Sequence, residues 1–187
     1  MLIAGCGYVG TALGLELTRQ GDRVWGVRRD ASQLPDALLP LSADLGDPAT
    51  LRLLPRAVDY LVYCAGADEA SDRAYTRIYV DGLRNVLHAL AGTGLRHAFF
   101  TSSTAVYGQA AGEWVDESSE TTPAHFSGRR LLEAERVLLE HDVPGTILRC
   151  SGIYGPGRTR LIDNVRQGSA TPSQRFTNRI HRDDVAG

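Results

Sequence analysis

The stretch Ile3-Ala4-Gly5-Cys6-Gly7-Tyr8-Val9-Gly10 decides the fold of this 187-residue chain. It has the form of a short apolar strand, a Gly-x-Gly-x-x-Gly turn and the start of a helix, which we expect over residues 11–20. In such a turn the first glycine allows a tight bend, the second lets a pyrophosphate approach the backbone, and the third lets the helix pack close to the strand. A structural turn without a ligand is the alternative. We predict a dinucleotide site in contact with Gly5, Gly7, Tyr8, Val9 and Gly10.

Strand and helix patterns alternate along the rest of the chain. We expect strands at residues 23–27, 41–44, 58–64, 97–101 and 145–150, and helical segments at residues 32–39, 47–54, 73–90 and within 123–140. This alternation calls for a parallel sheet covered by helices on both faces. It predicts an α/β fold with a doubly wound parallel sheet, a Rossmann fold, in strand order 3-2-1-4-5-6.

Ligands in such sheets bind outside the carboxyl ends of the strands. This rule adds four residues that follow the third and fourth strands to the predicted cofactor contacts: Asp44, Leu45, Ala65 and Gly66. Arg28 and Arg29 follow the second strand, at the place where a carboxylate would favour the ribose of NAD. A guanidinium group suits the 2′-phosphate of NADP, so we predict NADP as the cofactor. A solvated basic pair is the alternative, and NAD stays open because Asp30 follows directly.

Composition excludes several other classes of function. The net charge is −2 and the twenty basic residues are scattered, so we expect no nucleic-acid partner. No run of about 18 apolar residues is present, so we expect no membrane span and a cytoplasmic location. The three cysteines are isolated in the sequence, which argues against a metal site or a disulfide framework. We interpret them as small buried side chains, with a thiol at the cofactor crevice as the alternative: Cys6, Cys64 and Cys150.

A second pattern, Thr101-Ser102-Ser103-Thr104-Ala105-Val106-Tyr107-Gly108, identifies a family. It resembles the Ser-Ser-x-x-Val-Tyr-Gly element of the extended short-chain dehydrogenases/reductases, the NAD-dependent epimerase/dehydratase family. Residues 80–87, 148–157 and 178–186 resemble later segments of the same family, in the same order. The resemblance covers essentially the whole chain, and it is much less specific for the substrate than for the family.

The resemblance implies an NAD(P)-dependent oxidoreductase or epimerase that acts on a small molecule, either a sugar-nucleotide-like compound or another hydroxyl or carbonyl substrate. It implies an NAD(P)-binding domain at residues 1–150 and the start of a small substrate domain at residues 151–187, truncated relative to the usual length of the family. It also implies a homodimer in which the helices at 73–90 and 123–140, side by side, meet their two-fold copies. Three apolar residues fit that interface or the core equally well: Leu131, Leu138 and Val86.

By the same resemblance, Ser103 is the catalytic hydroxyl that bonds the reacting oxygen of the substrate. The family's tyrosine, four residues before a lysine, is missing from the following helix. One alignment places Phe126 and Arg130 at this pair, and Arg130 could then orient a ribose. The other alignment places Ser127 and Leu131 there. The glycine turn is one residue shorter than the family's usual one, and Tyr79 stands where the family commonly has an asparagine.

The missing tyrosine leaves the source of the proton open. We name Tyr107 and His125 as candidate catalytic residues, with His181 and Cys150 as further possibilities. The alternative to an enzyme is a non-catalytic dinucleotide-binding redox sensor or scaffold on the same fold. A remote third reading is a glycine-turn domain that binds another adenylate, such as the adenosine part of S-adenosylmethionine.

Overall fold

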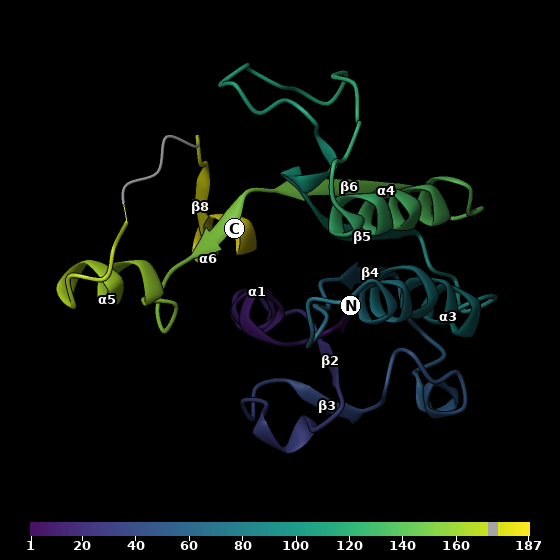
Figure 1. The fold of residues 1–187 in the computed structure, drawn as a ribbon. Coiled ribbons are helices and arrows are strands. Elements are labelled where there is room, and N and C mark those ends of the chain that lie inside the picture. Colours follow the sequence, from purple (N-terminus) through teal and green to yellow (C-terminus); the bar gives the residue numbers. More distant parts are fainter. Residues whose placement is uncertain (172–175) are drawn as a thin grey trace.

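The computed structural model describes residues 1–171 and 176–187. Its centre is a six-stranded sheet in the order β3-β2-β1-β4-β5-β6, with every pair of neighbours parallel (Figure 1). The strands are β1 (Leu2–Ala4), β2 (Trp25–Arg28), β3 (Leu39–Ser42), β4 (Tyr60–Tyr63), β5 (His97–Ser103) and β6 (Gly145–Cys150). The predicted α/β class and the predicted strand order are confirmed.

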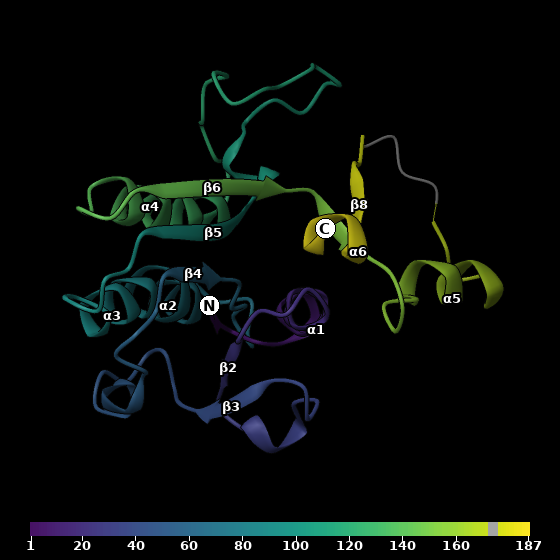
Figure 2. The same ribbon diagram turned by 180° about the vertical axis from the view of Figure 1, so that it is seen from behind.

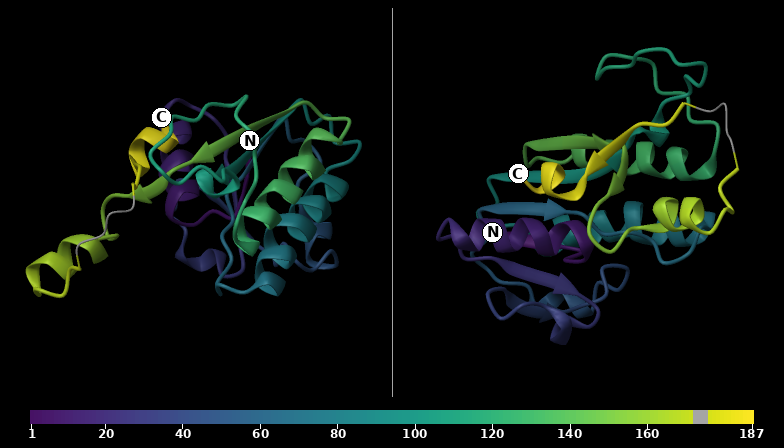
Figure 3. Two further views of the ribbon diagram at one scale, coloured as in Figure 1. Left: turned by 45° about the horizontal axis from the view of Figure 1, so that its top comes forward. Right: turned by 90° about the vertical axis from the view of Figure 1, so that its left-hand side faces the viewer.

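Helices cover both faces of this sheet. One face carries α2 (Asp72–Tyr75), the π-helical turn η3 (Thr76–Asp81), α3 (Gly82–Ala89) and α4 (Phe126–Leu139). The α2–η3–α3 helix and α4 lie side by side, as predicted (Figures 1 and 2). The other face carries α1 (Tyr8–Arg19), against which the short C-terminal helix α6 (Arg182–Ala186) packs (Figure 3).

The alternation of side chains along the strands divides the core into two layers. Leu2 and Leu61 are buried in the larger layer, under α3 and α4, whereas Ile3 and Val62 are buried in the smaller layer, under α1. Three residues considered for a dimer interface are buried in the larger layer and contribute to the core instead: Val86, Leu131 and Leu138. The homodimer stays a prediction that these residues no longer support.

The edge of the sheet differs from the prediction. The helical segments expected at residues 32–39 and 47–54 are single 3₁₀ turns, η1 (Ala31–Gln33) and η2 (Thr50–Leu53). Short segments of this kind have too few residues to offset the unfavourable nucleation of an α-helix. The third strand begins at Leu39, two residues before the predicted start. Pro40 is compatible with it because β3 is an edge strand, where a missing N–H is tolerated.

The chain leaves the main sheet after Cys150. A second, two-stranded parallel sheet pairs β7 (Gly152–Tyr154) with β8 (Arg179–His181), and α5 (Arg160–Arg166) lies between them in sequence. Figure 1 shows this part beside α1, at the carboxyl ends of the central strands. Across residues 1–171 and 176–187, none of the helices is long and apolar enough to cross a membrane.

Candidate functional site

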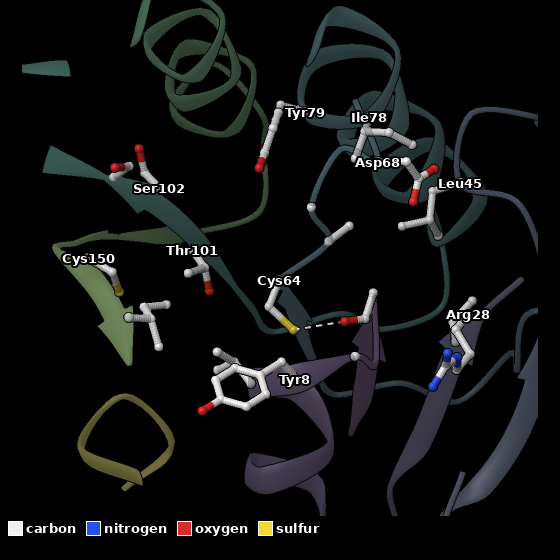
Figure 4. Close-up of a pocket in the computed structure, with 18 of the residues that line it drawn as sticks. Tyr8, Arg28, Leu45, Cys64, Asp68, Ile78, Tyr79, Thr101, Ser102 and Cys150 are labelled. Atoms are coloured by element: carbon white, nitrogen blue, oxygen red, sulfur yellow. Dashed lines mark hydrogen bonds between the residues drawn. The ribbon is translucent and has the colours of Figure 1, made fainter. Parts of the chain in front are cut away.

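A pocket of about 700 Å³ lies at the carboxyl ends of the central strands. The glycine turn, the ends of β2, β4 and β5, and the segment after β6 all contribute to its lining. Figure 4 shows Arg28 at one end of the pocket, Thr101 and Cys150 at the other end, and Tyr8 and Tyr79 on opposite sides between them. The pocket therefore joins the two loops that sequence patterns had singled out, the glycine turn and the end of the fifth strand.

The glycine turn has the geometry that a dinucleotide site requires. Gly5 has a φ of +84°, and a Cβ on it would lie 2.3 Å from the backbone of Ala65. A Cβ on Gly10 would lie 2.8 Å from Ile3 Cγ2, so the glycine lets α1 pack directly on the strand. A Cβ on Gly7 would meet only the Gly5 carbonyl, at 3.9 Å, so the backbone is open on its pocket side. Gly5, Gly7, Tyr8 and Val9 line the pocket, while Gly10 lies behind it.

Charged side chains gather at the end of the pocket near β2. Arg29 donates to Asp68 Oδ1 at 2.7 Å, and this hydrogen bond raises the pKa of the Arg29 guanidinium. The carboxylate of Asp30 accepts from Ser32 and Gln33, which holds its pKa below the usual value. Arg28 bonds only the Gln33 amide oxygen, at 3.3 Å, and forms no ion pair within the described residues. Arg28 is thus the cation at this end that is available to an anionic ligand.

Asp44 and Leu45 line the same end of the pocket. Asp44 forms an ion pair with Arg77 and accepts from the Gly46 N–H at 2.9 Å. Burial alone would raise the pKa of Asp44, but the bonds from Arg77 and Gly46 outweigh it and hold the pKa below its usual value. The Asn85 amide donates to the Leu45 carbonyl at 3.1 Å and ties this loop to α3. These three contacts hold the loop against η3 and α3.

At the opposite end of the pocket, called the neutral end here, the side chains at the ends of β4, β5 and β6 are uncharged. Ser103 Oγ accepts from the Ala105 N–H at 3.2 Å, which leaves its own hydrogen free to be donated into the pocket. Cys64 donates to the Gly5 carbonyl at 3.4 Å, and burial raises the pKa of its thiol to about 12. Cys150 also lines the pocket, and burial raises the pKa of this thiol. Both cysteines are therefore protonated at neutral pH and poor nucleophiles.

The helix that lacks the tyrosine and lysine presents a leucine to the pocket. Leu131 lines the pocket and is 5% exposed. Arg130 points away and forms a fork to Asp72, with bonds of 2.8 and 2.9 Å. The ring of Phe126 packs edge-on against Tyr75, with centroids 5.3 Å apart. This arrangement favours the alignment in which Ser127 and Leu131 occupy the tyrosine and lysine positions, and it does not bring Arg130 to the cofactor pocket.

The two candidate proton donors do not line the pocket. The Tyr107 hydroxyl donates to the Asp116 carbonyl at 2.8 Å and accepts from Arg149 at 2.9 Å, so it is engaged by residues outside the pocket lining. His125 is exposed and precedes the first turn of α4. His181 accepts from the Asp183 N–H at 3.3 Å, at the start of α6. Neither Tyr107 nor His125 is placed to reach a substrate oxygen beside Ser103.

Sequence reasoning missed several residues that complete the pocket. Tyr79 projects into it from η3, and Arg158 reaches it from the segment after β7. The Arg158 guanidinium lies 4.1 Å from the ring centroid of Tyr8, and that of Arg182 lies 5.2 Å from the same centroid. The Tyr8 hydroxyl is buried and has no hydrogen-bond partner among the described residues. In the sequence, the replacement of the family's asparagine by Tyr79 was the one indication that this position is unusual. No motif around Arg158 indicates that it lines a pocket.

The residues present fit a dinucleotide. The first turn of α1 borders the pocket, and the start of a helix favours phosphate through its free N–H groups and its dipole. The open backbone at Gly7 leaves room for a pyrophosphate beside it. The cavity volume also lies in the range of small-molecule and cofactor pockets. Within the described residues, no group of histidine, cysteine, aspartate or glutamate side chains could hold a metal ion.

Comparisons with known proteins agree with this geometry. The model of the NAD-dependent epimerase/dehydratase family matches residues 1–182. The chain is 30% identical to the protein YeeZ of Escherichia coli K12, over 99% of this chain and 69% of that protein. It is 32% identical to the N-acetyl-alpha-D-glucosaminyl-diphospho-ditrans,octacis-undecaprenol 4-epimerase of Escherichia coli O157:H7, over 88% of this chain and 52% of that enzyme.

A solved structure from Methylobacillus flagellatus, provisionally named as an NAD-dependent epimerase/dehydratase, is similar throughout. It is 47% identical, with a TM-score of 0.85, and the match covers 99% of this chain and 66% of that one. The chain thus spans about two thirds of the length of this protein and of YeeZ, and about half of the epimerase.

Proposed function

The chain belongs to the NAD-dependent epimerase/dehydratase family, and we propose that it binds a nicotinamide dinucleotide along the pocket and acts as an oxidoreductase or epimerase on a sugar-nucleotide-like substrate. One observation supports this proposal above the others: the glycine turn, the start of α1 and Ser103 all line the same pocket. The sugar part of the proposal is supported by the similarity to an epimerase whose named substrate is a glycosyl diphosphate.

The cofactor proposed is NADP, with its adenosine half at Arg28 and Asp44 and its pyrophosphate at Gly7 and Tyr8. Arg28 supports NADP because it lines the pocket without a carboxylate partner in the described residues. Arg29 is less suited to a phosphate because Asp68 already neutralises it. When bound, such a cofactor supplies a hydride donor or acceptor at the neutral end of the pocket.

Ser103 is the residue proposed to contact the reacting oxygen of the substrate. Its oxygen is held in position by the Ala105 N–H, and its hydrogen remains available to donate. A preorganised donor of this kind stabilises the negative charge that develops on an oxygen during hydride transfer. The Ser102 hydroxyl has a different role, because it is buried and donates to Glu135 at 2.6 Å.

Hydride transfer by the purified chain tests the proposal. We expect reduction of NADP, or oxidation of NADPH, with at least one member of a panel of UDP-sugars that includes UDP-glucose. Ser103→Ala should lower turnover about 10²-fold, the scale for losing one preorganised donor. The affinity for NADPH should stay unchanged in this variant, since Ser103 contacts the substrate rather than the phosphates. Turnover equal to wild type would remove Ser103 from the chemistry.

A non-catalytic dinucleotide-binding protein, either a redox sensor or a scaffold, is the second candidate. The specific observation that favours it is Leu131, an apolar side chain in the pocket wall at the position aligned with the lysine. A leucine neither moves a proton nor lowers the pKa of a phenol. Tight NADPH binding without hydride transfer on any sugar of the panel would favour this candidate. In either case we propose the cytoplasm as the place of action.

A further inference from the structure

Among the described residues, Tyr79 is the tyrosine that the face of the sheet covered by α3 and α4 presents to the pocket. It lies in the π-helical turn η3, and such turns occur mostly as single turns inside α-helices, frequently at functional sites. Its ring packs against Tyr75, with centroids 5.0 Å apart, and Tyr75 packs in turn against Phe126. The three packed rings, Phe126, Tyr75 and Tyr79, fix the position of the Tyr79 ring. Figure 4 shows the Tyr79 hydroxyl turned toward the interior of the pocket.

The hydroxyl of Tyr79 lies beside Gly66. A Cβ built on Gly66 would be 3.9 Å from this oxygen, with no closer neighbour. Gly66 follows β4, the strand next to the glycine turn, and Ala65 is packed directly on Gly5. The Tyr79 oxygen is therefore located between the turn that would hold the pyrophosphate and the end of β5 that carries Ser103.

A dinucleotide that runs from Arg28 past Tyr8 to Ser103 must place its second ribose in this stretch of the pocket. A ribose presents two hydroxyl groups that need hydrogen-bond partners once they are removed from water. On the face of the sheet covered by α4, the wall offers the apolar side chain of Leu131, which can provide none; the serine and threonine hydroxyls of the lining come from β5 and from the segment after β6. The Tyr79 hydroxyl can both donate and accept. Burial raises the pKa of this phenol more than the nearby Ala67 backbone N–H lowers it, so the hydroxyl is a neutral partner throughout the physiological pH range.

We propose that the Tyr79 hydroxyl hydrogen-bonds the ribose on the nicotinamide side of the cofactor and anchors that half of the dinucleotide in the pocket. This inference rests on the proposed function and adds a binding residue to it. By the family resemblance, a lysine of the α4 helix would hold this ribose, and Leu131 occupies the aligned position here; the neighbouring helix takes over the contact through the widened turn of η3. The anchoring group is thereby a neutral hydroxyl instead of a charged amine.

Titration calorimetry with NADPH and with ADP tests this assignment. ADP contains the adenosine half and lacks the second ribose, so only NADPH can report on Tyr79. Tyr79→Phe keeps the ring and its packing and removes one hydroxyl, so NADPH should bind about 5-fold more weakly, the scale for one neutral hydrogen bond, while ADP binds as before. Tyr75→Phe is the matched control: it belongs to the same three packed rings but does not line the pocket, and it should bind both ligands like wild type.

Three results would overturn the inference. Equal NADPH affinity in wild type and Tyr79→Phe would remove the ribose contact and leave the proposed function intact. Equal weakening of NADPH and ADP would show that Tyr79 supports the pocket only by packing. A wild-type protein that binds neither NADPH nor NADH would remove the cofactor itself, and the proposed function would fail with it.

Discussion

Removing Arg149 should destabilise the protein through the carboxylate that it leaves behind. The Glu135 side chain is 2% exposed, and Arg149 donates to its two oxygens at 2.7 Å and 3.1 Å. Ser102 supplies one further bond to the same carboxylate, at 2.6 Å. In Arg149→Met the stem remains apolar, but Glu135 keeps a buried charge whose only remaining partner among these groups is a hydroxyl.

The expected loss follows from this burial. Breaking a buried ion pair by removing one partner costs about 3–5 kcal/mol, because the other charge stays desolvated. Arg149 is 20% exposed, so water can partly replace it, and we expect the lower end, about 3 kcal/mol. For a chain of this size that corresponds to a fall in the melting temperature of about 6–12 °C. Glu135→Gln combined with Arg149→Met removes the orphaned charge and should recover part of the loss.

Urea unfolding followed by circular dichroism measures the free energy of unfolding in each variant. The matched control is Arg130→Met, on the same helix as Glu135, because the Arg130–Asp72 pair is exposed on the surface. Exposed pairs of this kind contribute little, so this control should unfold close to wild type. The reasoning would be refuted if Arg149→Met unfolded at the same urea concentration as Arg130→Met, or if the double variant were less stable than Arg149→Met alone.

Two further predictions concern the charged end of the pocket. Arg28→Ala should weaken NADPH binding at least about 5-fold and leave NADH unchanged, since a charge-assisted bond to phosphate exceeds a neutral one; calorimetry showing equal losses for both would remove the 2′-phosphate contact. Asp44 has a pKa held below the unfolded value of about 3.9, so its stabilising contribution is complete above that pH and is lost as pH falls through the lower folded value. Urea midpoints measured between neutral and strongly acidic pH should therefore fall less steeply in Asp44→Asn, and an identical acid profile would contradict the role of Arg77.

The arrangement of the sheet could be predicted from the sequence because it depends on local patterns. The glycine turn and the alternation of apolar runs with helical patterns fixed the strand order, since parallel strands need right-handed crossovers. The π-helical turn within residues 73–90 could not be predicted. The buried Tyr63 hydroxyl donates to the Ile78 carbonyl, which would otherwise accept the Gly82 N–H in an α-helix. That bond joins two residues that only the tertiary fold brings together. The sequence of the helix alone therefore does not predict the π-helical turn.

The candidate site divides in the same way. The sequence positions of the glycine turn and of the end of the second strand were enough to predict that both border the cofactor site. The structure places both in the pocket lining. The catalytic assignments depended on which side of a helix or strand each residue faces. One residue of shift separates Arg130, at the surface, from Leu131, in the pocket. Tyr107 illustrates the same limit, because its hydroxyl bonds with Arg149 of a strand 42 residues away in sequence.

Leu131 connects the stability of the fold with the way a cofactor has to be held. It packs in the main core with Ala134 and Leu138 and at the same time lines the pocket. A lysine in its place would bury its stem in this core and leave an ammonium group at the neutral end of the pocket. Among the described residues, three carboxylates line the pocket, and they follow β2, β3 and β4 toward the end of the pocket that carries Arg28 and Arg29: Asp30, Asp44 and Asp68.

Burying an ammonium group without a partner would lower the stability of the protein in the absence of a cofactor. A leucine side chain stabilises the core whether or not a cofactor is bound. The pocket wall is therefore stable without ligand, and Leu131 leaves the contacts of the nicotinamide half to other side chains of the lining. Tyr79 and Ser103 each offer a neutral hydroxyl for such a contact, and Thr101 and Ser151 line the pocket as well.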